Sequence, residues 1–120
     1  MGRKGLIMHE LALCHSMIEI IEREAVLQTF QQVKVVRLEF GALSCVEPEA
    51  LRFCFDTTTR GTIAEGARLE IITVPAEARC RDCGAEREFR RWGAACAECG
   101  GLRLDVRGGD KMRIKDLEVY

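Results

Sequence analysis

The sequence predicts an α+β fold: a small sheet with two helices, and a four-cysteine module inserted before the last strand. Apolar stripes at helical and strand spacing fill the first part of the chain, cysteine pairs replace them near residue 79, and a strand pattern returns at Met112. We therefore expect one α/β domain over residues 1–78 plus 108–120, and a small cysteine-rich domain over residues 79–107.

The first predicted element is an amphipathic helix over residues 8–28, because Leu11, Ile18 and Ile21 recur at three- and four-residue steps. A strand rich in β-branched residues follows over residues 33–40. A helix that buries one stripe against a strand is the basic layer of an α/β domain, so we expect these two elements to pack together.

The second helix is predicted to start at Pro48, because proline in the first turn loses no hydrogen bond, and to fade in the threonines at 57–59. A second strand over residues 67–74 stops at Pro75. The last strand starts at Met112, and we expect it to return to the first domain's sheet. The chain would then cross between the two domains twice.

Composition excludes several classes of protein. Lys and Arg number 18 against 19 Asp and Glu, a net charge of −1, so no basic field points to nucleic acid or an anionic membrane. No apolar run approaches the roughly 18–20 residues that span a bilayer, and no secretory signal is visible. We expect a cytoplasmic protein, in which closely spaced cysteines bind metal or do redox chemistry more often than they form disulfides.

Two C-x-x-C pairs form the core of the module, Cys80 with Cys83 and Cys96 with Cys99. Two residues between cysteines let a tight turn aim both sulfurs at one point, and two such turns can offer four thiolates in the tetrahedron that zinc favours. Gly84 and Gly100 each follow the second cysteine of a pair. Glycines there permit positive φ, and we expect their backbone N–H groups to point at the thiolates. The spacing predicts a structural zinc site, because all four ligand positions would be filled by protein.

Two other interpretations of the pairs stay open. A redox-active C-x-x-C is expected at a helix start after a strand, and two pairs would be more than it needs. Four cysteines can also hold an iron–sulfur cluster, although the even ribbon spacing favours zinc. The remaining cysteines have no partner at metal spacing: Cys14 and Cys54 fit helix-core positions, and Cys45 lies in a loop.

Met8, His9 and Glu10 open the first helix. Taken alone, an adjacent imidazole and carboxylate are a weak metal signal, and a solvent-exposed histidine explains them as well. In order along the chain, however, Met8-His9-Glu10-Leu11, residues 37–41, residues 46–51, residues 66–70 and the two C-x-x-C pairs together resemble the hydrogenase nickel-incorporation proteins HypA/HybF. The resemblance runs in one register from Met8 to about Val119.

This resemblance implies a nickel metallochaperone that delivers Ni(II) for maturation of [NiFe]-hydrogenase. Nickel would bind at Met8, His9 and Glu10, and structural zinc at the four cysteines. Partners would be the hydrogenase large subunit and a GTPase accessory protein, without nucleic acid or membrane, and the chain would be a monomer or a weak homodimer. Ni(II) accepts imidazole and backbone nitrogen donors, which suits such a segment.

One feature departs from the family pattern. Residues 1–7 precede Met8, so the nitrogen of Met8 is a peptide amide rather than a free amine. Either translation starts at Met8 and residues 1–7 are an extension, or the site uses another donor. An amide loses its proton less readily than an α-amine, so an obligatory extension should weaken nickel binding or change its geometry.

Two other classes of function are possible for a chain with this four-cysteine module. A zinc-ribbon adaptor would make protein or nucleic-acid contacts without transferring nickel, and nickel titration separates it from a metallochaperone. An enzyme is not expected, because the sequence offers no nucleophile–base pair, no phosphate-binding loop and no open three-ligand metal site.

Overall fold

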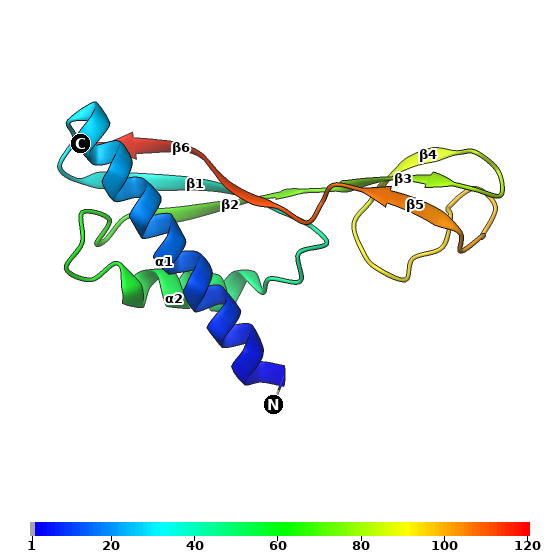
Figure 1. Ribbon diagram of the computed structural model, residues 1–120, viewed down its shortest axis with the longest axis horizontal. Coiled ribbons are helices and arrows are strands. Elements are labelled where there is room, and N and C mark those ends of the chain that lie inside the picture. Colours follow the sequence, from blue (N-terminus) through cyan, green and yellow to red (C-terminus); the bar gives the residue numbers. More distant parts are fainter. Residues whose placement is uncertain (1) are drawn as a thin grey trace. The chain divides into compact units, whose positions relative to one another are not determined.

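The structure is a computed structural model that describes the backbone of residues 2–120 and the side chains of residues 10–120. Helices and strands alternate in its first part, and strands alone follow (Figure 1). In chain order the elements are α1 (Gly2–Gln28), β1 (Val33–Gly41), α2 (Pro48–Thr58), β2 (Arg68–Val74), β3 (Ala76–Cys80), β4 (Glu86–Phe89), β5 (Leu104–Arg107) and β6 (Met112–Val119).

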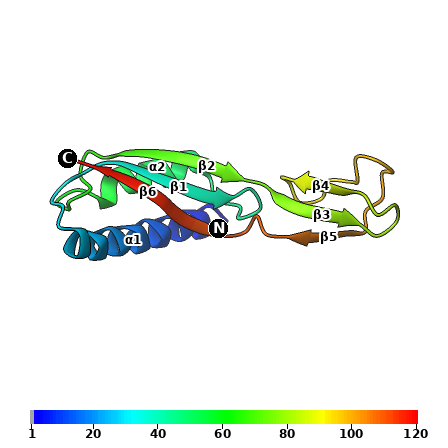
Figure 2. The same cartoon turned by 90° about the horizontal axis from the view of Figure 1, so that it is seen from above.

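The strands form two separate three-stranded sheets. The first has the order β2-β1-β6, so the last strand of the chain lies beside the first. The second has the order β4-β3-β5, and Figure 2 shows β3 between its two neighbours. Both of these neighbours run antiparallel to β3, with Ala78 opposite Arg87 on one side and Val106 on the other. The predicted fold class is therefore confirmed, including the insertion of the cysteine module before the last strand.

The chain divides into two compact units. The first comprises residues 1–38, 46–71 and 114–120, and the second comprises residues 39–45 and 72–113. The cysteine module predicted for residues 79–107 lies inside the second unit. Within the described residues, neither helix combines the length and the apolar composition that a bilayer crossing needs.

Helix α1 begins at Gly2, six residues before its predicted start, and no proline interrupts it between Gly2 and Met8. It ends at Gln28 as predicted, where Thr29 takes a positive φ of 59°. The predicted stripe is correct at Ile18 and Ile21, which are buried. Leu11 is only half-buried, and the other fully buried members of the stripe are Glu10, Cys14 and Met17.

Helix α2 begins at Pro48 as predicted, and Leu51, Cys54 and Phe55 form its buried face. Its N-cap residue, Glu47, makes no hydrogen bond with its own side chain to the helix start. The threonines at its C-terminus return their hydroxyls to the preceding turn, as when Thr59 Oγ1 donates to the Phe55 carbonyl oxygen at 2.7 Å. Such bonds compete with further helical ones, which explains why the helix stops here.

The second unit has a small core of Leu43, Ala76, Ala78 and Phe89, with Leu104 and Val106 packed against it. Side chains this few cannot stabilise a separate sheet by burial alone. The prediction that this part of the chain needs another source of folding free energy follows from the same reasoning.

Backbones approach closely where β1 ends. A Cβ added to Gly41 would lie 1.9 Å from the carbonyl oxygen of Gly109. The Gly41 N–H donates to the Lys111 carbonyl oxygen at 2.8 Å, and the Leu43 N–H donates to that of Gly109 at 2.7 Å. Only a residue without a side chain fits at Gly41, so the glycine is fixed by packing.

Candidate metal sites

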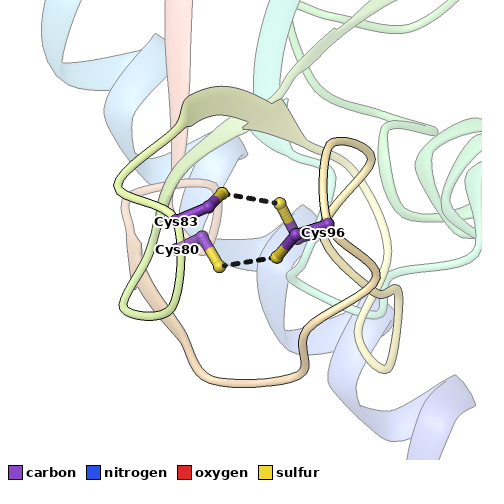
Figure 3. A group of neighbouring side chains, drawn as sticks. Cys80, Cys83 and Cys96 are labelled. Atoms are coloured by element: carbon purple, nitrogen blue, oxygen red, sulfur yellow. Dashed lines mark hydrogen bonds between the residues drawn. The ribbon is translucent and has the colours of Figure 1, made fainter.

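The four cysteines of the module come together at one point. Cys80 ends β3 and Cys83 lies in the turn that follows, while Cys96 and Cys99 lie in the turn before β5. Their sulfur atoms all lie within 4.8 Å of one another. Cys80 Sγ is 3.6 Å from Cys99 Sγ, and Cys83 Sγ is 3.7 Å from Cys96 Sγ. Figure 3 shows the two turns facing each other across these contacts.

These spacings fit a tetrahedral zinc ion. With Zn–S bonds of about 2.3 Å, the edges of an ideal ZnS₄ tetrahedron are about 3.8 Å. The Cys80–Cys99 and Cys83–Cys96 sulfur–sulfur distances are within 0.2 Å of that edge. All four donors are cysteines, which is a donor set typical of structural rather than catalytic zinc.

Backbone hydrogen bonds shape both turns in the same way. Gly84 N–H donates to the Cys80 carbonyl oxygen and Gly100 N–H to that of Cys96, each at 2.8 Å. Both glycines have positive φ, 77° and 74°, as the sequence predicted. The prediction that their N–H groups point at the thiolates is wrong, because these groups close the two turns onto carbonyl oxygens. The Gly101 N–H donates to Cys99 Sγ instead, at 3.4 Å.

Crowding of the sulfurs affects their proton affinity. The Cys99 backbone N–H is the main cause that lowers the pKa of the Cys96 thiol. The Gly101 N–H is the largest single influence on the pKa of Cys99 and lowers it, but the neighbouring thiols of Cys80, Cys83 and Cys96, together with burial, outweigh it and raise that pKa to about 12. Four thiols this close cannot all ionise unless a cation compensates their charge, which a divalent metal ion does.

The N-terminal candidates are described only in part. The side chains of Met8 and His9 lie outside the described residues, so the structure does not place them. Glu10 is fully buried, and its Oε2 accepts a hydrogen bond from the Glu47 backbone N–H at 2.9 Å. Its other oxygen, Oε1, is buried without a hydrogen-bond partner among the described residues. The carboxylate therefore holds the start of α2 with Oε2, while Oε1 accepts no hydrogen bond from the part of the chain that the structure describes.

The burial of Glu10 was missed from the sequence. A glutamate near the start of a helix is ordinarily a solvated residue. The available signal was its position four residues before Cys14, which places it on the buried stripe of α1. The predicted positions of the other cysteines are confirmed: Cys14 and Cys54 are buried, and Cys45 is exposed. His15 is exposed on the helix surface.

Comparison with known proteins identifies the family. Residues 8–119 match the family model described as hydrogenase/urease nickel incorporation, metallochaperone, HypA. The chain belongs to the HypA family. It is 52% identical over 112 residues to a hydrogenase maturation factor HypA from Rhodopseudomonas palustris strain TIE-1, a match that covers 93% of this chain and 99% of the relative. The corresponding HypA factor from Azotobacter chroococcum is 47% identical with the same coverage.

Two solved structures share the fold. The solution structure of the Ni metallochaperone HypA from Helicobacter pylori aligns with a TM-score of 0.64 at 21% identity, covering 92% of this chain and 96% of that one. A second solution structure, of a HypA protein, aligns with a TM-score of 0.66 at 23% identity, covering 94% and 97%. The chain is thus a HypA-family metallochaperone for nickel incorporation in hydrogenase maturation, with a four-cysteine site compatible with zinc.

Proposed function

We propose that this HypA-family chain binds its cargo, Ni(II), at the segment Met8-His9-Glu10. His9 supplies imidazole, Glu10 supplies a carboxylate oxygen, and nitrogens of the nearby backbone complete the donor set. The observation that supports this proposal is the burial of the Glu10 carboxylate, one residue after His9 in the chain. Its Oε1 is a buried acceptor without a donor among the described residues.

A buried, unpaired carboxylate oxygen requires an explanation, because desolvating it costs free energy that no hydrogen bond returns. A metal ion at this oxygen would compensate the negative charge. The hydrogen bond from Glu47 holds the other oxygen at 2.9 Å and so fixes the direction of the carboxylate. We infer that Glu10 is both an anchor for α2 and a ready donor for the cargo ion.

Zinc is proposed as the resident metal of Cys80, Cys83, Cys96 and Cys99. Bound there, it would supply four metal–sulfur bonds that hold the two turns together, and it would take no part in chemistry. We further propose two functional domains. Residues 79–107 form the zinc ribbon, and residues 1–78 plus 108–120 form the nickel-binding domain. A small domain of this kind takes most of its folding free energy from its metal.

The chain would act as a carrier rather than an enzyme. We propose that it passes Ni(II) to the large subunit of a [NiFe]-hydrogenase in the cytoplasm, assisted by a GTPase accessory protein, as a monomer or weak homodimer. The favoured client is hydrogenase, because the curated relatives above are named as hydrogenase maturation factors.

The test is a calorimetric Ni(II) titration of the zinc-loaded full chain beside His9→Ala, with His15→Ala as the matched control. We expect one Ni(II) per chain, loss of binding in His9→Ala and no loss in His15→Ala, since His15 lies exposed outside the proposed site. Zinc content should be the same in all three proteins. Nickel uptake by His9→Ala at the parental affinity would place the cargo site elsewhere.

A further inference from the structure

The two cysteine turns belong to a short internal repeat. Residues 80–87 read C-R-D-C-G-A-E-R and residues 96–103 read C-A-E-C-G-G-L-R. Both fit the pattern C-x-(D/E)-C-G-x-x-R. Cysteines and glycines of the pattern are explained by metal geometry and turn conformation, but the acid and the arginine are not.

The structure pairs the acid of each repeat with the arginine of the other. Asp82 of the first repeat accepts a hydrogen bond from Arg103 Nε of the second at 3.0 Å, and Arg103 Nη2 donates to the same oxygen. Glu98 of the second repeat is ion-paired with Arg87 of the first, on β4. The two ion pairs therefore cross between the turns and link them to each other.

Two further hydrogen bonds hold the first turn in place. The Arg81 side chain pairs with Asp105 on β5, with its Nε 2.9 Å from Asp105 Oδ1, and the Arg81 backbone N–H donates to the Arg103 carbonyl oxygen at 2.8 Å. Both residues between Cys80 and Cys83 are thus held by the segment that follows the second turn.

The close approach of the two turns depends on Gly101. A Cβ added there would lie 2.5 Å from Asp82 Oδ2 and 3.2 Å from Cys99 Sγ. The carboxylate of one turn consequently lies beside a metal-binding sulfur of the other, separated only by a residue with no side chain.

Arg87 and Arg103 also compensate negative charge near the four-cysteine site. Zinc with four thiolates carries a net charge of −2, and the carboxylates of Asp82 and Glu98 add to it. Arg103 and Arg87 each place a fixed cation on one of these carboxylates. The pairs are half-exposed, with 36–71% of each side chain accessible, so each one alone contributes modestly.

We propose that Asp82–Arg103 and Glu98–Arg87 form a crossed clamp, a set of positioning residues that controls how long the four-cysteine site retains its metal. None of the four side chains is a metal ligand. Each holds one turn against the other, so that a turn cannot swing away and expose its two sulfurs to a competing ligand. This inference rests on the proposed zinc site.

The experiment measures zinc transfer from the full chain to a coloured chelator, 4-(2-pyridylazo)resorcinol, at low salt. Asp82→Asn and Glu98→Gln remove one charge each with little change of shape. Each should speed zinc release about two- to fivefold, and the double variant should speed it more than either. The matched control is Glu88→Gln, since Glu88 pairs with Arg90 in the same ribbon but outside the clamp. It should release zinc at the parental rate.

A charge-swap variant and cobalt(II) spectra distinguish the loss of the clamp from a general loss of structure. The exchange Asp82→Arg with Arg103→Asp should restore most of the parental rate, and high salt should reduce the differences because it screens exposed charges. Cobalt(II)-substituted parent and variants should share one thiolate absorption spectrum, since the ligands are unchanged. Equal release by the parent, Asp82→Asn and Glu98→Gln, or equal acceleration by Glu88→Gln, would overturn the clamp. A parent chain that takes up no zinc would instead overturn the zinc site itself.

Discussion

The indole N–H of Trp92 donates a hydrogen bond to the carbonyl oxygen of Leu43 at 3.1 Å, although 49 residues separate the two in the sequence. The ring also meets Phe89 edge to face, with 6.2 Å between centroids, while 57% of Trp92 stays exposed. Leu43 packs into the small core of the second unit. One half-exposed side chain thus fastens the segment after β1 to the strands of the cysteine module.

Trp92→Phe is expected to remove this hydrogen bond while keeping an aromatic ring against Phe89. The Leu43 carbonyl oxygen would then depend on water, and the loss should be about 0.5–1.5 kcal/mol of unfolding free energy. Trp92→Leu, which removes the aromatic pair as well, should cost more. Urea denaturation of zinc-loaded protein followed by circular dichroism checks the order. If Trp92→Phe and the parent unfold at the same urea concentration, the hydrogen bond contributes nothing to stability.

Gly41→Ala is expected to be among the most harmful single-methyl additions in the chain. The new Cβ would meet the Gly109 backbone at 1.9 Å, and neither backbone can move without breaking the hydrogen bonds of Gly41 and Leu43. Such overpacking commonly costs about 1–3 kcal/mol or more. Gly61→Ala is the matched control, because its Cβ would meet nothing within 4 Å and only its φ of 78° is unfavourable.

That control should itself lose about 1–2 kcal/mol, the ordinary cost of a non-glycine residue in the left-handed region. Thermal unfolding of both variants gives the comparison. A melting temperature for Gly41→Ala at or above that of Gly61→Ala would show that the backbone crossing relaxes more easily than its hydrogen bonds suggest.

The cysteines should react with iodoacetamide in three groups. In zinc-loaded protein at pH 8, only exposed Cys45 is expected to react. Burial is the main cause that raises the pKa of Cys14, to about 12, and burial also raises that of Cys54. A thiol with a pKa of about 12 is ionised in only about one molecule in ten thousand at pH 8, and the thiolate is the nucleophile.

After chelation of zinc, the four site cysteines should also react with iodoacetamide. After denaturation, Cys14 and Cys54 should react as well, so that all seven cysteines of the chain are labelled. Intact-mass spectrometry counts the adducts at each stage. The raised pKa of Cys14 also has a consequence for stability, since the unfolded chain ionises at a lower pH than the folded one. This contribution is complete below about pH 9 and is lost as the pH rises toward 12. Rapid labelling of Cys14 in folded, zinc-loaded protein would contradict its burial.

The sequence predicted those helices and strands whose boundaries are set by residues within the element itself. Pro48 marked the start of α2, and the β-branched run marked β1 at nearly its observed bounds. The predicted start of α1 was wrong because the apolar periodicity that predicted the helix begins only at Leu11, whereas the helix extends back to Gly2 through Gly5. Strands β3, β4 and β5 were not predicted, because short segments such as Ala76–Cys80 lack β-branched residues and form through pairing with one another.

The cysteine site was predictable because its ligands are close in sequence, in two pairs that each occupy one turn. Glu10 was not, because its burial depends on a hydrogen-bond donor 37 residues away that only the fold brings near. The ion pairs of the crossed clamp join residues 21 positions apart for Asp82 and Arg103. Their repeat is visible in the sequence, but which acid meets which arginine is not.

Glu10 has two proposed roles that substitutions can separate. Glu10→Gln keeps an oxygen that can accept a hydrogen bond from the Glu47 N–H, so its melting temperature should be close to that of the parent. Because it lacks the charged Oε1, it should bind Ni(II) more weakly. Glu10→Ala leaves the Glu47 N–H unpaired and should lose about 1.5–3 kcal/mol of unfolding free energy. Thermal unfolding and nickel titration of both variants provide the readouts. Parental nickel affinity in Glu10→Gln would leave Glu10 with the anchoring role alone.

Removal of residues 1–7 should strengthen nickel binding. In the full chain the backbone from Gly2 onward is helical, so the nitrogen of Met8 is an amide inside α1. A chain that starts at Met8 has a free α-amine instead, with an ordinary pKa of about 7.7–8.0, and loses its proton far more readily. One additional nitrogen donor should tighten binding at least about tenfold, equivalent to about 1.4 kcal/mol.

Acetylation of the new Met8 amine is the matched control, since it removes the donor and leaves every side chain in place. Nickel titrations of the full, shortened and acetylated chains at pH 7.5 check the order, and all should weaken below about pH 6.5, where imidazole takes up a proton. The shortened chain should bind most tightly and the acetylated chain should return to the affinity of the full chain. If the acetylated and free chains bind nickel equally, the amine is not a ligand. His9 and Glu10 must then form the site with other donors.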